Sequence, residues 1–191
     1  MIVEKLKQDI VFKETLRGHS MEFHSTWGLF NPRHVDEGSR LLIDQLTVRP
    51  DHRSLDIGCG YGPIGLTLAR LCPQGEVHMI DKDFVAVEFA RKNASINRIF
   101  NCHVYLSNAF SCVPDIRFHN IVTNLPANSG NEMLSIILHD AWAHLEIGGQ
   151  LYVVTISRLK GFIGRNLRVI FGNYEKVKQG RDHTVARAVK E

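Results

Sequence analysis

The segment from Asp56 to Gly65, Asp-Ile-Gly-Cys-Gly-Tyr-Gly-Pro-Ile-Gly, combines an acidic residue with closely spaced glycines. Glycines that follow a strand let the backbone turn sharply and approach a ligand, and a helix that comes next directs its free amide N–H groups toward that ligand. The Asp56 carboxylate would repel a pyrophosphate but can pair with the ammonium of an amino acid. This combination indicates S-adenosylmethionine, which carries a sulfonium, an ammonium and a carboxylate but no phosphate. The contacts predicted in this segment are Asp56, Gly58, Cys59, Gly60, Tyr61 and Gly62.

Polar residues after the next two predicted strands extend the expected donor site. Asp81 lies 21 residues after Gly60, at the end of a strand, where a carboxylate can accept hydrogen bonds from both ribose hydroxyls of an adenosine. Lys82, beside it, is included in the predicted site. This spacing fits NAD as well as S-adenosylmethionine. After the third strand, Asn108 can bind the adenine amino group through its side chain, and Ala109 can offer a backbone amide.

The segment Asn124-Leu-Pro-Ala127, after a fourth predicted strand, indicates where a methyl group could be accepted. The side-chain oxygen of Asn124 and the carbonyl of Leu125 can both accept hydrogen bonds from an exocyclic NH₂ group. These contacts would orient the nitrogen lone pair toward a methyl donor and favour the positive charge that develops on nitrogen. Pro126 fixes φ and holds the turn. Asn124, Leu125 and Pro126 are therefore the predicted catalytic residues.

Short apolar runs alternate with longer amphipathic ones, which is typical of strands that alternate with helices. The spacing predicts parallel strands at 53–57, 76–80, 102–106, 120–123 and 150–156. It predicts helices at 37–46, 63–71, 84–97, 132–145 and 160–171. Two further strands, at 174–178 and 184–189, read as a hairpin. We therefore expect an α/β fold: a Rossmann-like, doubly wound, mostly parallel seven-stranded sheet that ends in an antiparallel hairpin and is preceded by a short β extension within 9–26.

Composition narrows the class of protein. The chain has 191 residues, 44% of them apolar and 23% charged, which suits one compact domain. No apolar run approaches the length of about 18 residues that a membrane span needs, and the first residues contain charges throughout, unlike a secretory signal. The expected location is the cytoplasm. The four cysteines form no C-x-x-C pair and no two of the ten histidines are spaced i,i+4, so no metal is predicted.

Charge is unevenly distributed along the chain. Residues 158–191 contain nine Lys or Arg against three acidic residues, whereas the net charge of the whole chain is +3. A basic segment of this kind suits a polyanionic partner such as RNA, although a solvated basic face without a partner has the same composition.

Together these motifs resemble the class I S-adenosylmethionine-dependent methyltransferases, and more narrowly the "small" methyltransferase domain of enzymes that methylate guanine N2 in ribosomal RNA. The resemblance runs from about Val11 onward. It includes Gly28-Leu-Phe30 and the upstream pattern Val35-Asp-x-Gly-Ser-x-Leu-Leu42, which is fairly specific to this family. The resemblance implies a single methyltransferase domain over 1–191, in which 1–35 form an N-terminal extension with a substrate and cofactor loop and 36–191 form the Rossmann-like core.

The chain departs from the family pattern at two positions. Leu125 replaces the first proline of N-P-P. The resulting Asn-Leu-Pro is similar to the form found in the adenine-N6 dimethylases of ribosomal RNA. Ala127 replaces the aromatic residue that stacks on a flipped base. Either another ring stacks instead, with Trp27 and Phe30 as the candidates, or the substrate is not a nucleobase. The residues expected to contact the substrate are Trp27, Phe30, Arg158 and Arg181.

The sequence thus predicts an N-methyltransferase that uses S-adenosylmethionine and acts on an exocyclic amine of a base, guanine N2, in ribosomal or other structured RNA. A protein glutamine-amide or small-molecule methyltransferase, and a non-catalytic methyltransferase-like module, remain open. An NAD-dependent oxidoreductase fits the glycines and Asp81, but Asp56, the Asn-Leu-Pro segment and the closing hairpin argue against it.

Overall fold

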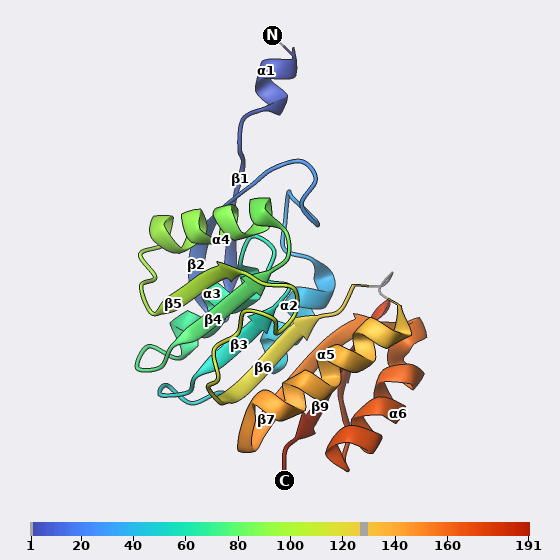
Figure 1. The fold of residues 1–191 in the computed structure, drawn as a ribbon. Coiled ribbons are helices and arrows are strands. Elements are labelled where there is room, and N and C mark those ends of the chain that lie inside the picture. Colours follow the sequence, from blue (N-terminus) through green and yellow to red (C-terminus); the bar gives the residue numbers. More distant parts are fainter. Residues whose placement is uncertain (1, 127–129) are drawn as a thin grey trace.

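The computed structural model of the protein describes residues 2–126 and 130–191. Its centre is a seven-stranded sheet with the strand order β5-β4-β3-β6-β7-β9-β8 (Figure 1). The strands are β3 (Ser54–Ile57), β4 (Val77–Asp81), β5 (Cys102–Leu106), β6 (Phe118–Asn124), β7 (Leu145–Ile156), β8 (Glu175–Gln179) and β9 (His183–Val189). The first five are parallel, and β9 runs antiparallel to both β7 and β8. The predicted mostly parallel sheet with a closing hairpin is confirmed.

Helices cover both faces of the sheet (Figure 1), so most residues of its central strands, polar ones included, are buried. One core forms between the sheet, α2 (Glu37–Gln45), α3 (Pro63–Leu71) and α4 (Phe84–Ile96). The other forms under α5 (Asn131–His144) and α6 (Lys160–Phe171), which follows a short turn of 3₁₀-helix, η1 (Ser157–Leu159). No helix in the described part of the chain is both long and apolar enough to cross a membrane.

The predicted N-terminal extension is an antiparallel hairpin of β1 (Ile10–Leu16) and β2 (His19–Ser25). Asn93 of α4 and Asn97, the C-cap of that helix, bind the hairpin to the core. Asn93 exchanges hydrogen bonds of 2.7 and 2.9 Å with the backbone of His24, and Asn97 exchanges bonds of 2.9 and 2.7 Å with Glu22. These amides pair backbone groups that the hairpin would otherwise leave unsatisfied.

The structure differs from the expected elements in two places. Residues 2–6 form a short helix, α1 (Ile2–Leu6), which extends away from the body (Figure 1). Strand β7 begins at Leu145 and not at the predicted residue 150, so Gly148 and Gly149 lie within the strand. A Cβ at Gly149 would lie 2.8 Å from the Glu146 carbonyl oxygen and 3.0 Å from that of Phe118. The glycine is needed there for a close approach of backbones, which sequence alone does not separate from a helix end.

Candidate active site

The carboxyl ends of β3 and β4 hold the glycine-rich loop between them. The amides of Gly58 and Cys59 donate to the Ile80 carbonyl at 2.8 and 2.9 Å, and the Gly60 amide donates to Asp81 Oδ2 at 2.9 Å. The loop that precedes α3 is therefore fixed against the acidic residue at the end of β4. This arrangement brings together the two main groups of residues that the sequence assigned to the methyl donor.

Asp56 lies under this loop and is fully buried. Its Oδ2 accepts a 2.8 Å hydrogen bond from the Gly65 amide, while its Oδ1 has no hydrogen-bond partner. Burial, reinforced by the nearby Asp81, raises the pKa of Asp56 to about 7 even though the Gly65 bond lowers it. The unpaired oxygen lacks a donor of the kind that an ammonium group supplies, directly or through water, so Asp56 fits the methionine end of S-adenosylmethionine.

The three glycines of the loop, Gly58, Gly60 and Gly62, have different structural roles. Gly58 and Gly60 have φ values of +71° and +56°, and no atom lies within 4 Å of the place where their Cβ atoms would be. They leave open space that a ligand can occupy. At Gly62, by contrast, a Cβ would lie 2.9 Å from the Met79 methyl group, so this glycine serves packing.

The side chains of Cys59 and Tyr61, between these glycines, are buried. The Tyr61 hydroxyl donates to the carbonyls of Asn31 and His34, at 3.1 and 3.0 Å, and so holds the loop before α2. Burial raises the pKa of the Cys59 thiol well above its usual value. Any contact of Cys59 or Tyr61 with the donor therefore comes from the backbone.

Asp81 and the loop after β5 supply the remaining predicted donor contacts. The two Asp81 oxygens each accept one backbone amide, from Gly60 and from Asp83, so each keeps a lone pair for a ribose hydroxyl. Lys82 and Asn108 are exposed. Ala109 adopts a left-handed backbone with φ of +49°, within a turn that the buried Ser107 hydroxyl stabilises by a 2.6 Å bond to its carbonyl.

Asn124 ends β6, and its amide group has a defined orientation. The side-chain nitrogen donates to Asp36 Oδ2 at 2.9 Å and to Ser39 Oγ at 3.0 Å. The amide oxygen is therefore directed away from the Asp36 carboxylate. The Leu125 amide donates to the Val154 carbonyl at 3.0 Å, its side chain is buried, and Pro126 is exposed. Ala127, where the sequence departs from the family pattern, lies outside the described residues.

The family profile described as "Methyltransferase small domain" matches residues 20–187. The chain belongs to the methyltransferase small-domain family. This membership confirms the predicted Rossmann-like fold, the enzyme class and S-adenosylmethionine as the methyl donor.

Individual relatives agree with this assignment. The uncharacterized protein YbxB of Bacillus subtilis is 36% identical over 98% of this chain and 94% of its own length. The ribosomal RNA small subunit methyltransferase C of Hamiltonella defensa is 33% identical over 84% of this chain but only 48% of its own length. The solved T. thermophilus 16S rRNA N2 G1207 methyltransferase, in complex with AdoMet and guanosine, superposes with a TM-score of 0.85 at 28% identity. That match covers 95% of this chain and 50% of the solved one, so the chain spans about half the length of both RNA methyltransferases.

The predicted substrate residues of this methyltransferase lie on two segments. Trp27 and Phe30 are 45% and 70% exposed in the loop before α2, and the Arg33 guanidinium lies 4.8 Å from the centre of the Trp27 ring. Arg158 and Arg181 are exposed at the other end of the chain. Arg181 lies in the β8–β9 turn, two residues before His183, which pairs with Ile156 at the carboxyl end of β7. It therefore lies at the same end of the sheet as Asn124, which pairs with Val154 of β7.

Sequence reasoning missed the two partners of Asn124. Asp36 is the N-cap of α2 and accepts the Ser39 amide at 3.1 Å, a role that does not by itself indicate a contact with Asn124. The available signal was the Asp-x-Gly-Ser pattern itself, because its Asp36 and Ser39 both accept hydrogen bonds from the Asn124 amide.

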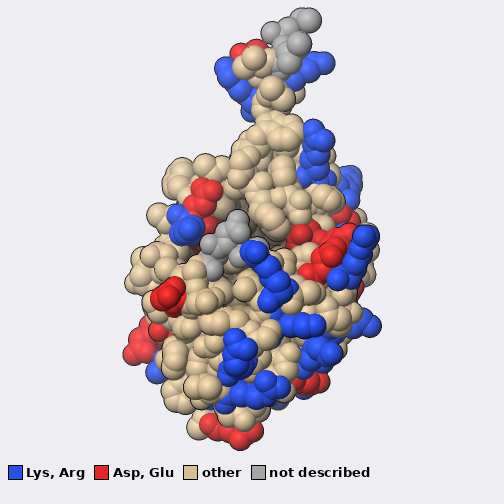
Figure 2. Space-filling model, turned by 90° about the vertical axis from the view of Figure 1, so that its right-hand side faces the viewer, with Lys and Arg blue, Asp and Glu red and all other residues tan. Residues whose placement is uncertain are grey.

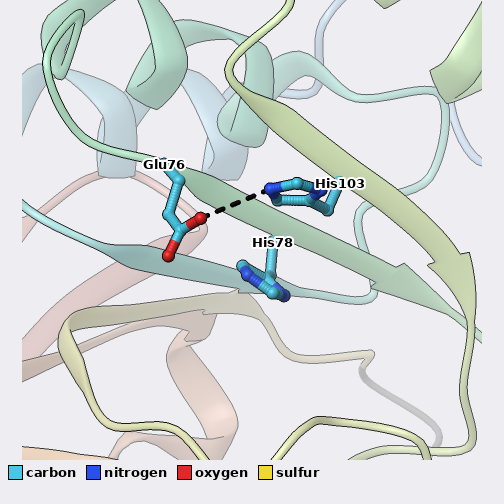
Figure 3. A group of neighbouring side chains, drawn as sticks. All are labelled: Glu76, His78 and His103. Carbon is cyan, nitrogen blue, oxygen red and sulfur yellow. Dashed lines mark ion pairs between the residues drawn. The ribbon is translucent and has the colours of Figure 1, made fainter.

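A group of possible metal ligands lies at the amino ends of β4 and β5, away from the carboxyl ends of the strands that hold the donor site (Figure 3). Glu76, His78 and His103 offer ligand atoms that lie within 4.8 Å of one another. Glu76 forms ion pairs with His103, at 3.3 Å, and with Arg53, at 2.5 Å, so both of its oxygens are already engaged. The spacing rules applied to the sequence overlook this group because it joins neighbouring strands. The absence of a metal stays a prediction.

Proposed function

We propose that this methyltransferase methylates an exocyclic amine of a base, guanine N2, in ribosomal or other structured RNA. The observation that carries the proposal is the orientation of Asn124, whose nitrogen is bound by Asp36 and Ser39 so that its oxygen is left to accept N–H groups. The names of two relatives, a ribosomal RNA small subunit methyltransferase and a 16S rRNA N2 G1207 methyltransferase, support the choice of base and RNA. Such a substrate also favours the expected cytoplasmic location, and residues 1–191 are proposed to act as one domain.

The donor binds along the carboxyl edge of the sheet in this proposal. Asp56 receives the ammonium end, and Gly58 and Gly60 give it room. Asp81 accepts the ribose hydroxyls, and Asn108 with the Ala109 amide reads the adenine. Bound S-adenosylmethionine supplies an electrophilic methyl group on a sulfonium. Lys82, Cys59, Tyr61 and Gly62 shape this site mainly through the backbone.

The acceptor amine is held by Asn124 and Leu125. The Asn124 side-chain oxygen and the Leu125 carbonyl accept its two N–H groups and direct its lone pair along the line of transfer. The C–S bond breaks as the C–N bond forms, the sulfur keeps the electron pair, and the nitrogen becomes positively charged. Both acceptors stabilise that charge. The proton then leaves to water, so no dedicated general base is required. Pro126 keeps the turn rigid.

Binding of a flipped base needs an aromatic surface and a positive field. Trp27 and Phe30 are exposed rings in the loop before α2, and stacking of this kind contributes about 1–3 kcal/mol per base. Lys and Arg side chains gather in the lower half of the face that α6 contributes to (Figure 2). The exposed basic residues of η1, α6, β8 and the following turn are Arg158, Lys160, Arg165, Arg168, Lys176, Lys178 and Arg181. A phosphate backbone is the polyanion that suits such a face.

Transfer of a tritiated methyl group tests the substrate class. The protein is incubated with labelled donor and, separately, with ribosomal subunits, bulk tRNA and total protein from cells that lack the enzyme. Label in RNA that is lost after ribonuclease treatment supports the proposal. Label that survives ribonuclease and is lost after protease treatment identifies a protein amide as the acceptor and overturns it.

A further inference from the structure

Asp36 is nearly buried, with 8% of its surface exposed, and accepts hydrogen bonds on both carboxylate oxygens. Its Oδ1 accepts from the Asn31 side chain at 2.9 Å. Its Oδ2 accepts from the Ser39 amide at 3.1 Å and from the Asn124 side chain at 2.9 Å. The carboxylate thus joins the loop before α2, the first turn of α2 and the end of β6.

A carboxylate can only accept hydrogen bonds, so it decides which end of the Asn124 amide faces it. In the observed orientation the nitrogen faces Asp36, and its second hydrogen is taken by the Ser39 hydroxyl at 3.0 Å. A flipped amide would place its oxygen against the carboxylate and leave the buried carboxylate oxygen without that donor. Losing this hydrogen bond to a charged group disfavours the flipped orientation by roughly 10- to 100-fold.

The role of helix N-cap does not require a buried carboxylate, as a second N-cap in the same chain shows. Asp83 caps α4 by accepting the Val85 amide at 2.8 Å, and it does so as an exposed side chain. Asp36 is instead buried. A Cβ at Gly38 would lie 2.7 Å from His183 Cδ2 and 2.9 Å from Asp36 Oδ2, so the glycine leaves room for both side chains at this point.

We infer that Asp36, together with Ser39, is a positioning residue that locks the Asn124 amide with its oxygen toward the acceptor, so that the site selects groups that donate an N–H. The inference rests on the proposed function for its consequence in catalysis. The inference gives the Asp-x-Gly-Ser segment one role, in which Asp36 and Ser39 bind the amide and Gly38 leaves room for the side chains of Asp36 and His183.

The orientation can be tested without any substrate. In a ¹H–¹⁵N spectrum, the side-chain NH₂ signals that disappear in Asn124→Ala belong to Asn124. Asp36→Ser keeps a residue that can cap α2 but is too short to reach Asn124, and we expect it to shift those signals toward the values of a free amide. Asp44→Ser, on the exposed side of the same helix, is the matched control. Unchanged Asn124 signals in Asp36→Ser would overturn the inference.

The consequence for catalysis is tested by a double-mutant cycle of Asp36→Ser and Asn124→Ala. The single-turnover methylation rate is measured on whichever fraction, RNA or protein, takes up the label. We expect Asp36→Ser to lower the single-turnover rate by about 10- to 100-fold when Asn124 is present, the equivalent of losing one charged hydrogen bond. In the Asn124→Ala background the same change should alter the rate by less than about 2-fold. An equal loss in both backgrounds would show that Asp36 acts independently of Asn124. If the label enters protein, the proposed function fails while the cycle still tests the positioning role.

Discussion

At the scale of single residues, the burial of Asp56 lowers the stability of the folded protein, and donor binding can offset that loss. Its carboxyl group is fully buried with one unpaired oxygen, and its pKa is about 7 in the folded protein against the ordinary 3.8. An unfolded chain loses this proton near pH 4, whereas the folded protein keeps it until about pH 7. The contribution of Asp56 to folding stability therefore falls as the pH rises from 4 to 7, and the loss is complete above pH 7.

We expect Asp56→Asn to melt several degrees above the wild type at pH 8 and within a degree or two of it at pH 4, since about 1 kcal/mol shifts the melting temperature of a domain this size by roughly 2–4 °C. The same change should weaken donor binding by about 10- to 100-fold, because a charged partner of the ammonium is lost. Thermal melts at both pH values and calorimetric titration measure the two effects. A variant that is less stable at pH 8, or that binds the donor normally, would contradict this role.

Asn124 acts in the transition state if it stabilises charge on the acceptor nitrogen. We expect Asn124→Ala to fold and bind donor almost as the wild type does, and to lower kcat by roughly 10²–10³ with a smaller change in KM. Single-turnover methylation and thermal melts separate this effect from a structural one. A destabilised protein with a normal rate per folded molecule would show that Asn124 only supports the turn before Pro126.

At the scale of elements, the periodic pattern predicted most helices and strands to within one or two residues, including α3, β5 and α6. It was also predictable that Asp56, Asp81 and the glycine-rich loop lie near one another, because parallel strands bring their carboxyl ends to the same end of the sheet. The contacts that depend on tertiary packing were not predictable. Asn124 and Asp36 are 88 residues apart, and nothing local in either segment specifies which end of the amide faces the carboxylate.

His78, near the amino end of β4, is a second residue that makes stability depend on pH, and it lies at the end of the strand away from the donor site. Burial, with the neighbouring His103, lowers the pKa of His78 below 6.5, and its Nδ1 lies 3.0 Å from the Tyr105 hydroxyl. Below pH 6.5 the unfolded chain binds a proton that the folded His78 does not, so the stability contribution of His78 falls as the pH is lowered.

We therefore expect the melting temperature of the wild type, relative to His78→Phe, to fall between pH 7.5 and 5.5. The apolar ring suits the position because Phe118 packs against the edge of His78. His139→Phe, at an exposed position of α5, is the control and should track the wild type. A constant difference between wild type and His78→Phe across this range would exclude His78 as a source of acid sensitivity. Donor binding should be the same in all three proteins.

At the scale of the whole molecule, charge is segregated between two parts of the chain. Residues 158–191 carry a net charge of +6, and the rest of the chain carries −3. The turn that contains Arg181 lies at the edge of the sheet that holds Asn124, so the basic segment borders the proposed site. An RNA bound there would release counterions from its phosphates, which makes the affinity dependent on salt.

Reversing two of these charges, in Lys160→Glu with Arg181→Glu, should weaken RNA binding by at least about tenfold at low salt. It should also reduce the slope of log affinity against log salt by roughly 1–2, because each phosphate contact contributes about 0.7–0.9. Donor binding should not change. Lys5→Glu with Lys7→Glu, on the exposed α1 and its end, is the charge-matched control. Equal affinities and slopes for the two double variants would rule out this face as the RNA surface.

The most direct test of the account is to identify the atom that receives the methyl group. Ribosomal RNA labelled by the wild type and by Asn124→Ala is digested to nucleosides and separated beside standards. The account predicts that label from the wild type comigrates with N2-methylguanosine and that the variant yields little of it in a single turnover. Label on a ribose hydroxyl or on a ring carbon of the base would contradict it.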